Sequence, residues 1–208
     1  MANSFFITGI STEVGKTLVS AIVVKALGAD YWKPIQAGDL ENSDTIKIKA
    51  LVGAMDTTTL HPEGVCLQTP MSPHAAAALE EIKIEIQKIV RPKTNNNLVI
   101  EGAGGLLVPL NDRQTVADLI LPEDKIVLVS RHYLGSINHT LLTIEALRNR
   151  NLKVAGIIFS GNEHQSTESI ISIKTKIPII GRINEEVLID SKVVEHYASL
   201  FTQNLKNL

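Results

Sequence analysis

Short, continuously apolar segments alternate along this chain with longer segments that have helical spacing. Phe5 to Thr8 is one such apolar run, and Lys16 to Leu27 follows it with apolar residues three to four positions apart. Continuously apolar strands separated by helices are typical of a parallel sheet that is buried on both faces. The sequence therefore predicts an α/β fold of three layers around a mostly parallel central sheet.

Further strands are expected where apolar runs recur, and helices where apolar residues have a period near 3.6. Strands are predicted at residues 31–34, 98–100, 126–129, 154–159 and within 177–183. Helices are predicted at residues 43–52, 74–90, 138–150 and 190–204. The proline- and glycine-rich residues 53–73 are expected to form a loop. Because no repeat or linker interrupts the pattern, residues 1–208 are predicted to form a single domain.

Charge and composition argue against several classes of protein. The net charge is −2 and aromatic residues make up 4%, so neither nucleic-acid binding nor base stacking is expected. No apolar stretch approaches the ~20 residues that cross a bilayer, and the N-terminus lacks the basic segment of a secretion signal. The single cysteine, Cys66, excludes an internal disulfide and a Cys-rich zinc site. We expect Cys66 to be a small apolar filler or a loop residue, and the protein to be cytoplasmic.

A glycine-rich loop joins the first predicted strand to the first predicted helix. It reads Gly9-Ile10-Ser11-Thr12-Glu13-Val14-Gly15-Lys16-Thr17, with five residues between the glycines. A P-loop of this kind directs backbone N–H groups at phosphate oxygens, with Lys16 at the β- and γ-phosphates and the Thr17 hydroxyl available to Mg²⁺. Because a strand precedes the loop and a helix follows it, nucleotide binding is the favoured interpretation. The alternative is a chance Gly-Lys-Thr sequence in a surface turn.

Three charged residues stand at the ends of other predicted elements. Glu101 follows an apolar strand and precedes Gly102-Ala103-Gly104-Gly105, so its carboxylate is expected to face the phosphate loop. Lys33 ends the second predicted strand and is expected to point into the same cavity, the alternative being a solvated edge lysine. Asp44 begins a predicted helix, where spacing alone favours a capping role. Two lysines facing one triphosphate favour a substrate that is itself an anion when it meets the γ-phosphate.

Taken in chain order, these segments resemble the dethiobiotin synthetases. The matching segments are Thr12-Glu13-Val14-Gly15-Lys16-Thr17, Lys33-Pro34-Ile35, Asn42-Ser43-Asp44, Ser72-Pro73-His74, Glu101-Gly102-Ala103-Gly104-Gly105, Leu134-Gly135-Ser136-Ile137-Asn138-His139 and Ala155-Gly156. The resemblance covers roughly residues 4–183 and implies a P-loop NTPase fold. It also implies an enzyme of biotin biosynthesis that uses ATP, Mg²⁺ and CO₂ or bicarbonate to close a ureido ring on 7,8-diaminopelargonate.

The resemblance implies a role for each matching residue. Lys33 and Lys16 would be catalytic. Thr17, Asp44 and Glu101 would hold Mg²⁺, which reverses the capping interpretation of Asp44. The nucleotide would contact Glu13, Val14, Gly15, Lys16, Thr17, Leu18, Asp44, Glu101, Gly102, Ala103, Gly104, Ser160, Ile183 and Asn184. The diamine would contact Thr12, Ala37, Pro73, Gly105 and Asn138. Such enzymes are homodimers in which the substrate carboxylate reaches toward the partner subunit.

Several positions depart from the pattern of the family. Ile10-Ser11 stands where Thr-Asp is usual, Ala37 stands where a hydroxyl residue is common, and Tyr133 stands where a basic residue is common. Near the adenine, Ser160-Gly161 replaces Asn-Asp and Ile183-Asn184 replaces Ile-Pro. These last two departures leave a relaxed nucleotide preference open, which a comparison of ATP, GTP and CTP as donors tests.

Three other functions share parts of this pattern. Partition and positioning ATPases carry a second lysine after the first loop glycine, where this chain has Ile10. A regulatory nucleotide-binding domain that has lost its chemistry is not expected to keep Lys33, Asp44 and Glu101 together. A related ATP-dependent amide ligase that acts on another carboxylate stays open, and only substrate trials separate it from a dethiobiotin synthetase.

Overall fold

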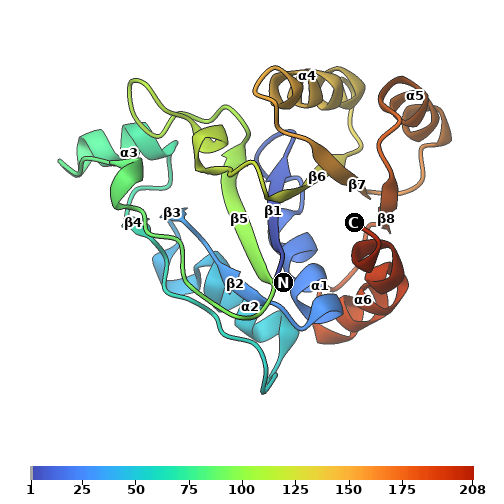
Figure 1. The fold of residues 1–208 in the computed structure, drawn as a ribbon, viewed down its shortest axis with the longest axis horizontal. Coiled ribbons are helices and arrows are strands. Elements are labelled where there is room, and N and C mark those ends of the chain that lie inside the picture. The colour runs from blue at the N-terminus through green and yellow to red at the C-terminus, as the bar shows by residue number, and fades with distance from the viewer. Residues whose placement is uncertain (1) are drawn as a thin grey trace.

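The computed structural model describes residues 2–208; Met1, which the single-domain prediction includes, lies outside them. Within this range the centre is a six-stranded sheet of order β2-β5-β1-β6-β7-β8, in which all neighbouring strands are parallel (Figure 1). Its strands are β1 (Ser4–Gly9), β2 (Asp30–Trp32), β5 (Leu98–Gly105), β6 (Lys125–Arg131), β7 (Val154–Ser160) and β8 (Ile179–Ile183). The predicted α/β fold with a parallel sheet is confirmed.

Helices cover both faces of this sheet (Figure 1). On one side α1 (Lys16–Leu27) packs against α2 (Asp44–Val52) and α6 (Ser191–Lys206). On the other side α4 (Ser136–Arg148) packs against α5 (Gln165–Thr175). Because both faces are covered, successive strand residues are buried and the strands are continuously apolar.

The strand order places the carboxyl end of β1 at the reversal point of the sheet. From β1 the chain passes to β2 at one edge, returns through β5 beside β1, and continues to β6 on the other side of β1. Gly9, the last residue of β1, pairs with Gly105 of β5 and with Val129 of β6. Ligands of open α/β sheets bind beyond the carboxyl ends of the strands at such a reversal point.

A small second sheet lies beside the main one. Its strands, β3 (Ile35–Ala37) and β4 (Val65–Leu67), pair in parallel, and α3 (Pro73–Leu79) contacts both. The prediction of an uninterrupted loop over residues 53–73 is therefore wrong for β4. Three residues are too few to show a hydrophobic period, so the sequence carried no signal for either strand. Cys66, expected to be a filler or loop residue, is exposed within β4.

The helix predicted over residues 74–90 is wrong beyond Leu79, where α3 ends. Glu81 adopts the left-handed region with a φ of 54°, and the Ile82 N–H donates to the Ala77 carbonyl at 2.8 Å. This bond pattern closes the last turn of a helix and turns the chain away. Isoleucines continue beyond the turn and imitate a helical period, but residues 82–85 form neither helix nor strand, and Ile86–Lys88 form only a short 3-10 helix.

Helix α5 lies where no element was predicted. Its buried residues, Thr167, Ile171 and Thr175, recur every four positions, as expected for the inner face of a helix. Two of the three are polar, so the apolar period that reveals a helix in a sequence is weak here. The threonine hydroxyl of Thr175 is satisfied within the helix by the Ile171 carbonyl at 2.8 Å.

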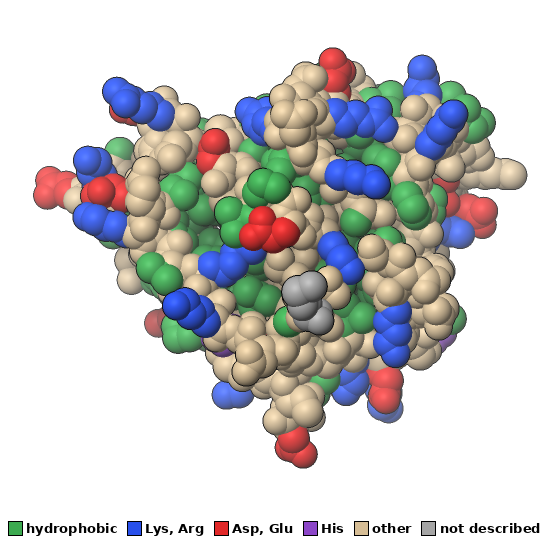
Figure 2. Space-filling model, in the orientation of Figure 1, with side chains coloured by type: hydrophobic (Ala, Val, Ile, Leu, Met, Phe, Trp, Pro, Cys, Tyr) green, Lys and Arg blue, Asp and Glu red, His purple; other side chains and the backbone are tan. Residues whose placement is uncertain are grey.

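Charged side chains of both signs are interspersed on the face shown in Figure 2, with hydrophobic side chains between them. This face therefore has no continuous basic stripe of the kind that follows a nucleic-acid backbone. Among the helices of residues 2–208, none combines the length and the apolar character needed to cross a membrane.

Candidate active site

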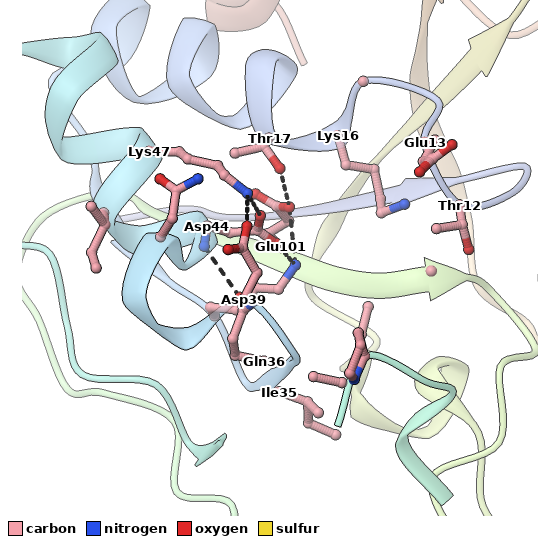
Figure 3. A pocket seen from close by; sticks show the side chains of 18 of the residues that line it. Thr12, Glu13, Lys16, Thr17, Ile35, Gln36, Asp39, Asp44, Lys47 and Glu101 are labelled. Atoms are coloured by element: carbon pink, nitrogen blue, oxygen red, sulfur yellow. Dashed lines mark hydrogen bonds and ion pairs between the residues drawn. The ribbon is translucent and has the colours of Figure 1, made fainter. Parts of the chain in front are cut away.

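A cleft of about 1050 Å³ opens beyond the carboxyl ends of the central strands (Figure 3). It brings together segments that lie far apart in the sequence: the phosphate loop, the residue after β2, the start of α2, the start of α3 and the end of β5. The sequence-predicted residues that line it are Thr12, Glu13, Gly15, Lys16, Thr17, Leu18, Lys33, Ala37, Asp44, Pro73, Glu101, Ala103 and Gly104.

Three predicted residues lie beside the cleft and act through the backbone or the core. Val14 is buried beneath the phosphate loop. The Gly102 carbonyl accepts a hydrogen bond from Lys33 Nζ at 3.2 Å. Gly105 pairs with Gly9 between β5 and β1, which keeps the two glycine-rich loops adjacent.

Four further predicted residues lie outside the lining of the cleft. Asn138 is exposed in the first turn of α4. Ser160 ends β7 next to Gly15, where an added Cβ would lie 3.3 Å from the Ser160 hydroxyl oxygen. Ile183 is buried at the end of β8, and the Asn184 N–H donates to the Tyr197 hydroxyl at 3.0 Å. Ser160 and Ile183 thus end β7 and β8, and Asn184 follows β8, outside the lining of the cleft that holds Asp44 and Glu101.

The phosphate loop presents the start of α1 to the cleft. Gly15 is the N-cap of α1 with a φ of 95°, a left-handed conformation that favours glycine. Lys16 is the first helical residue, is 7% exposed, and donates from Nζ to the Ser11 carbonyl at 3.1 Å. Burial, with the Lys33 ammonium nearby, lowers the pKa of Lys16 to about 8. Its charge is incompletely compensated, so this point of the cleft attracts an anion.

Arg131 supports the loop from the end of β6, a contact that the sequence analysis missed. Its Nη1 donates to the Glu13 carbonyl at 3.0 Å, and Glu13 is a non-glycine residue with a φ of 56°. A bond to this peptide helps to hold the left-handed conformation, which disfavours side chains. The signal available in the sequence was a basic residue at the carboxyl end of a strand next to β1.

Lys33 lies between two carboxylates at the floor of the cleft. Its Nζ is 2.6 Å from Asp44 Oδ2 and 3.0 Å from Glu101 Oε1. Thr17 Oγ1 donates to the same Glu101 oxygen at 3.0 Å (Figure 3). Burial alone would lower the pKa of Lys33, but the Glu101 and Asp44 carboxylates raise it above its usual value. Burial would likewise raise the pKa of Asp44, and the Lys33 ammonium lowers it.

The start of α2 settles which of two adjacent residues caps the helix. Ser43 is the N-cap, and its hydroxyl accepts from the Ile46 N–H at 3.4 Å. Asp44 is the first residue of the helix, so its carboxylate is free to face Lys33. The Gln36 side-chain oxygen accepts from the Asp44 N–H at 3.2 Å and ties this residue to β3. Ser43 therefore caps the helix, and the Asp44 side chain lines the cleft instead.

A third lysine, Lys47, also lines the cleft and was not predicted. Its Nζ is 2.8 Å from Asp39 Oδ2 and 3.9 Å from Asp44 Oδ1 (Figure 3). Lys47 stands three positions after Asp44, a spacing that places both side chains on one helix face and that was readable in the sequence. Asp39 follows the three-residue strand β3 and carried no such signal.

The comparison with known sequences identifies close relatives along nearly the whole chain. A family model described as an AAA domain matches residues 3–192. The ATP-dependent dethiobiotin synthetase BioD of Christiangramia forsetii is 59% identical over 205 residues, which cover 99% of each chain. The protein of the same name from Cytophaga hutchinsonii is 50% identical over 196 residues, 93% of this chain and 94% of its own.

Solved structures with a similar fold are more distant in sequence. A chain of the MinC:MinD cell division protein complex of Aquifex aeolicus has a TM-score of 0.62 and 17% identity, covering 100% of this chain and 97% of its own. A putative plasmid partition protein of Borrelia burgdorferi has a TM-score of 0.61 and 14% identity, covering 100% of both chains. These structures establish the fold of P-loop NTPases alone. The sequence relatives show that the chain belongs to the family of ATP-dependent dethiobiotin synthetases.

Proposed function

We propose that this ligase of biotin biosynthesis forms dethiobiotin in the cleft between the phosphate loop, Lys33 and Glu101, with ATP as the phosphoryl donor. One observation carries the assignment of the site. The Lys33 ammonium lies 2.6 Å from Asp44 and 3.0 Å from Glu101, in the cleft that Lys16 and Thr17 also line. Two ammonium groups beside a phosphate loop suit a reaction in which an anionic substrate meets the γ-phosphate.

The residues of the cleft fit Mg²⁺. Thr17, Asp44 and Glu101 offer only oxygen donors, and Mg²⁺ takes one or two carboxylates with phosphate and water oxygens. Within residues 2–208 no group of three or more His, Cys, Asp or Glu side chains is arranged to hold a metal. The nucleotide phosphates would therefore complete the coordination. When bound there, Mg²⁺ would neutralise charge on the β- and γ-phosphates.

The reaction proceeds through three steps. One amine of 7,8-diaminopelargonate adds to CO₂ and loses a proton, which gives a carbamate. A carbamate oxygen attacks the γ-phosphorus of ATP, ADP leaves, and a carbamic–phosphoric anhydride forms. The second amine then attacks the carbonyl carbon and loses a proton as phosphate leaves, which closes the ureido ring.

The chain's own residues contribute charge and position to these steps. Lys16 and Lys33 are both buried and place ammonium groups at the phosphoryl group in transfer, where preorganised charge is most effective. Lys33 keeps its proton because the neighbouring carboxylates raise its pKa. Thr12, Ala37 and Pro73 line the same cleft and are assigned to the diamine.

We also propose that two copies form the active enzyme. Asn138, assigned to the diamine, is exposed outside the cleft of its own chain. Leu134, which precedes α4 by two residues, is 103% exposed, and a partner subunit would remove this large apolar side chain from water. A second copy that covers Leu134 would bring Asn138 toward the partner's cleft. Light scattering should show a dimer, and Leu134→Asp should shift it toward monomer.

The decisive experiment supplies the protein with 7,8-diaminopelargonate, bicarbonate, Mg²⁺ and ATP and detects the ring product by mass. Lys33→Met serves as the inactive control, because it removes the ammonium and keeps an unbranched side chain. Phosphate release without the ring product would favour the related amide ligase. Nucleotide binding without phosphate release would favour a regulatory domain.

The same assay tests Ser160, Ile183 and Asn184, the residues that the resemblance places near the adenine. With ATP, GTP and CTP compared as donors, similar turnover would support the relaxed preference that Ser160 and Asn184 leave open. Strict use of ATP would contradict it. We place this activity in the cytoplasm, which the single free cysteine, Cys66, supports.

A further inference from the structure

Strand β2 places a buried phenol beside the carboxylate of Glu101. Tyr31 is 0% exposed, and its hydroxyl donates to Glu101 Oε2 at 3.0 Å. Tyr31 precedes Lys33 by two positions, a spacing that directs both side chains to the same side of an extended chain. Both side chains therefore reach Glu101 from one short segment.

The backbone of Tyr31 is fixed on both sides. It pairs with Val99 in the main sheet. Its N–H donates to the Thr59 carbonyl at 3.0 Å, and its carbonyl accepts from the His61 N–H at 2.9 Å. A side chain with a fixed backbone and full burial has one available position, so the hydroxyl is a rigid reference point for Glu101.

The two oxygens of Glu101 have different partners. Oε1 accepts from Thr17 Oγ1 and Lys33 Nζ, each at 3.0 Å, on the side of the phosphate loop. Oε2 accepts from Tyr31 at 3.0 Å. Glu101 is 1% exposed, so solvent contributes little to its orientation. The last torsion of a glutamate is broad, and a donor at one oxygen fixes the plane of the carboxylate and so the direction in which the other oxygen points.

We propose that Tyr31 is a positioning residue that orients Glu101 so that Oε1 is available to a Mg²⁺–nucleotide complex. The inference rests on the proposed role of Glu101 as a Mg²⁺ ligand. Tyr31 would touch neither the metal nor the phosphates and would act through the carboxylate. Hydrogen bonds to a ligating carboxylate from outside the coordination sphere set ligand orientation and metal affinity.

The test is the Mg²⁺ dependence of ADP binding, measured by calorimetry for the wild-type protein and for Tyr31→Phe. The variant removes the hydroxyl and keeps the ring. We expect the Mg²⁺ affinity of the ADP complex to fall ~10–100-fold, the range for loss of such an outer partner. ADP binding in EDTA should stay unchanged. A merely structural role of Tyr31 would lower thermal stability and leave the Mg²⁺ dependence as in the wild type.

Two further variants separate failure of this inference from failure of the proposed function. Glu101→Gln should lose the increase in ADP affinity that Mg²⁺ produces in the wild type. If the variant keeps this increase, Glu101 is not a Mg²⁺ ligand. If Glu101→Gln loses the increase and Tyr31→Phe keeps it, only the positioning role is overturned. Tyr133→Phe, which removes an exposed phenol hydroxyl, is the matched control and should bind Mg²⁺ as the wild type does.

A second measurement does not depend on the folding of Tyr31→Phe. The chain has three tyrosines, so 3-fluorotyrosine labelling gives a simple ¹⁹F spectrum. Tyr133→Phe and Tyr197→Phe assign two of the resonances and leave the third to Tyr31. Mg²⁺ added to the ADP complex should shift the Tyr31 resonance. An unshifted resonance would overturn the inference.

Discussion

Two buried ionised side chains lie at the two ends of strand β2, Asp30 as its first residue and Lys33 just after its last, and the charges around them differ. At the start of β2, Asp30 is 3% exposed. It accepts from the Thr59 N–H at 2.9 Å, the Thr94 hydroxyl at 2.7 Å and the Asn96 amide at 3.2 Å, with His61 Nε2 also at 3.2 Å. Burial would raise the pKa of Asp30, but these hydrogen bonds lower it. This carboxylate is fully partnered within the chain.

Just after the other end of β2, the charges are crowded together. Lys33 contacts Asp44 and Glu101, while Lys16 stands nearby with a pKa lowered to about 8 by burial and by Lys33. Lys33 is partnered by two carboxylates, whereas the hydrogen bond of Lys16 Nζ goes to the neutral Ser11 carbonyl, so the Lys16 ammonium is left to be compensated by an anionic ligand. A buried charge whose hydrogen bonds are all made within the chain therefore anchors the fold. A buried charge with no opposite charge in contact with it marks a place where a ligand binds.

The largest expected effect is at the crowded end. Lys16→Ala should lower dethiobiotin formation ~10²–10³-fold, the effect of losing one preorganised donor. Its folded state should be as stable as the wild type, because an incompletely compensated buried ammonium disappears. Product formation and thermal unfolding, measured on the same preparation, check both statements. Near-normal turnover would contradict the phosphate role of Lys16.

The second effect is expected at the anchored end, in stability and not in turnover. Asp30→Asn keeps the shape of the side chain but leaves at least one buried donor without an acceptor, which costs about 2 kcal/mol of unfolding free energy. Urea denaturation measures the loss, and kcat should stay that of the wild type. Asp56→Asn, at an exposed position, is the matched control and should change neither quantity. If Asp30→Asn lowered kcat and left the unfolding free energy unchanged, Asp30 would serve catalysis and not the stability of the fold.

A smaller effect follows from the pKa of Asp30, which lies below its usual value of 3.8. The folded state keeps this carboxylate ionised at a pH where the unfolded chain takes up a proton. The stabilisation is therefore present above the unfolded pKa and is lost as the pH falls through the lower, folded pKa. From about pH 5 downward, the difference in unfolding free energy between the wild type and Asp30→Asn should narrow. A constant difference would show that Asp30 has an ordinary pKa.

The main sheet could be predicted because its strands are buried on both faces and are apolar throughout. The crowded end of β2 could also be predicted in part, since Lys33 and Glu101 stand at strand ends next to the phosphate loop. The small sheet could not be predicted, because strands as short as Ile35–Ala37 have no readable period. Helix α5 was missed because threonines replace apolar residues on its inner face.

Roles that depend on tertiary neighbours were the least readable. Ser43 and Asp44 are both good residues for a helix start, and only the folded chain shows that Ser43 caps the helix while Asp44 faces Lys33. Tyr31 reads as an apolar strand residue, although its hydroxyl bonds to Glu101. A sequence gives the type of each side chain but not the partner that uses its polar atom.

The smallest expected effect concerns Lys47, and it tests whether burial or the number of cations decides function in the cleft. Lys47 lies in the same cleft as Lys16, but its side chain is 36% exposed and its ion pair with Asp39 is open to solvent. Exposed ion pairs contribute about 0–1 kcal/mol, so Lys47→Gln should raise the KM for ATP less than about fivefold and leave kcat unchanged. Steady-state kinetics with varied ATP measures this. If Lys47→Gln lost as much activity as Lys16→Ala, every ammonium of the cleft would contribute equally to catalysis. Burial without a contacting carboxylate would then not be what distinguishes Lys16 from Lys47.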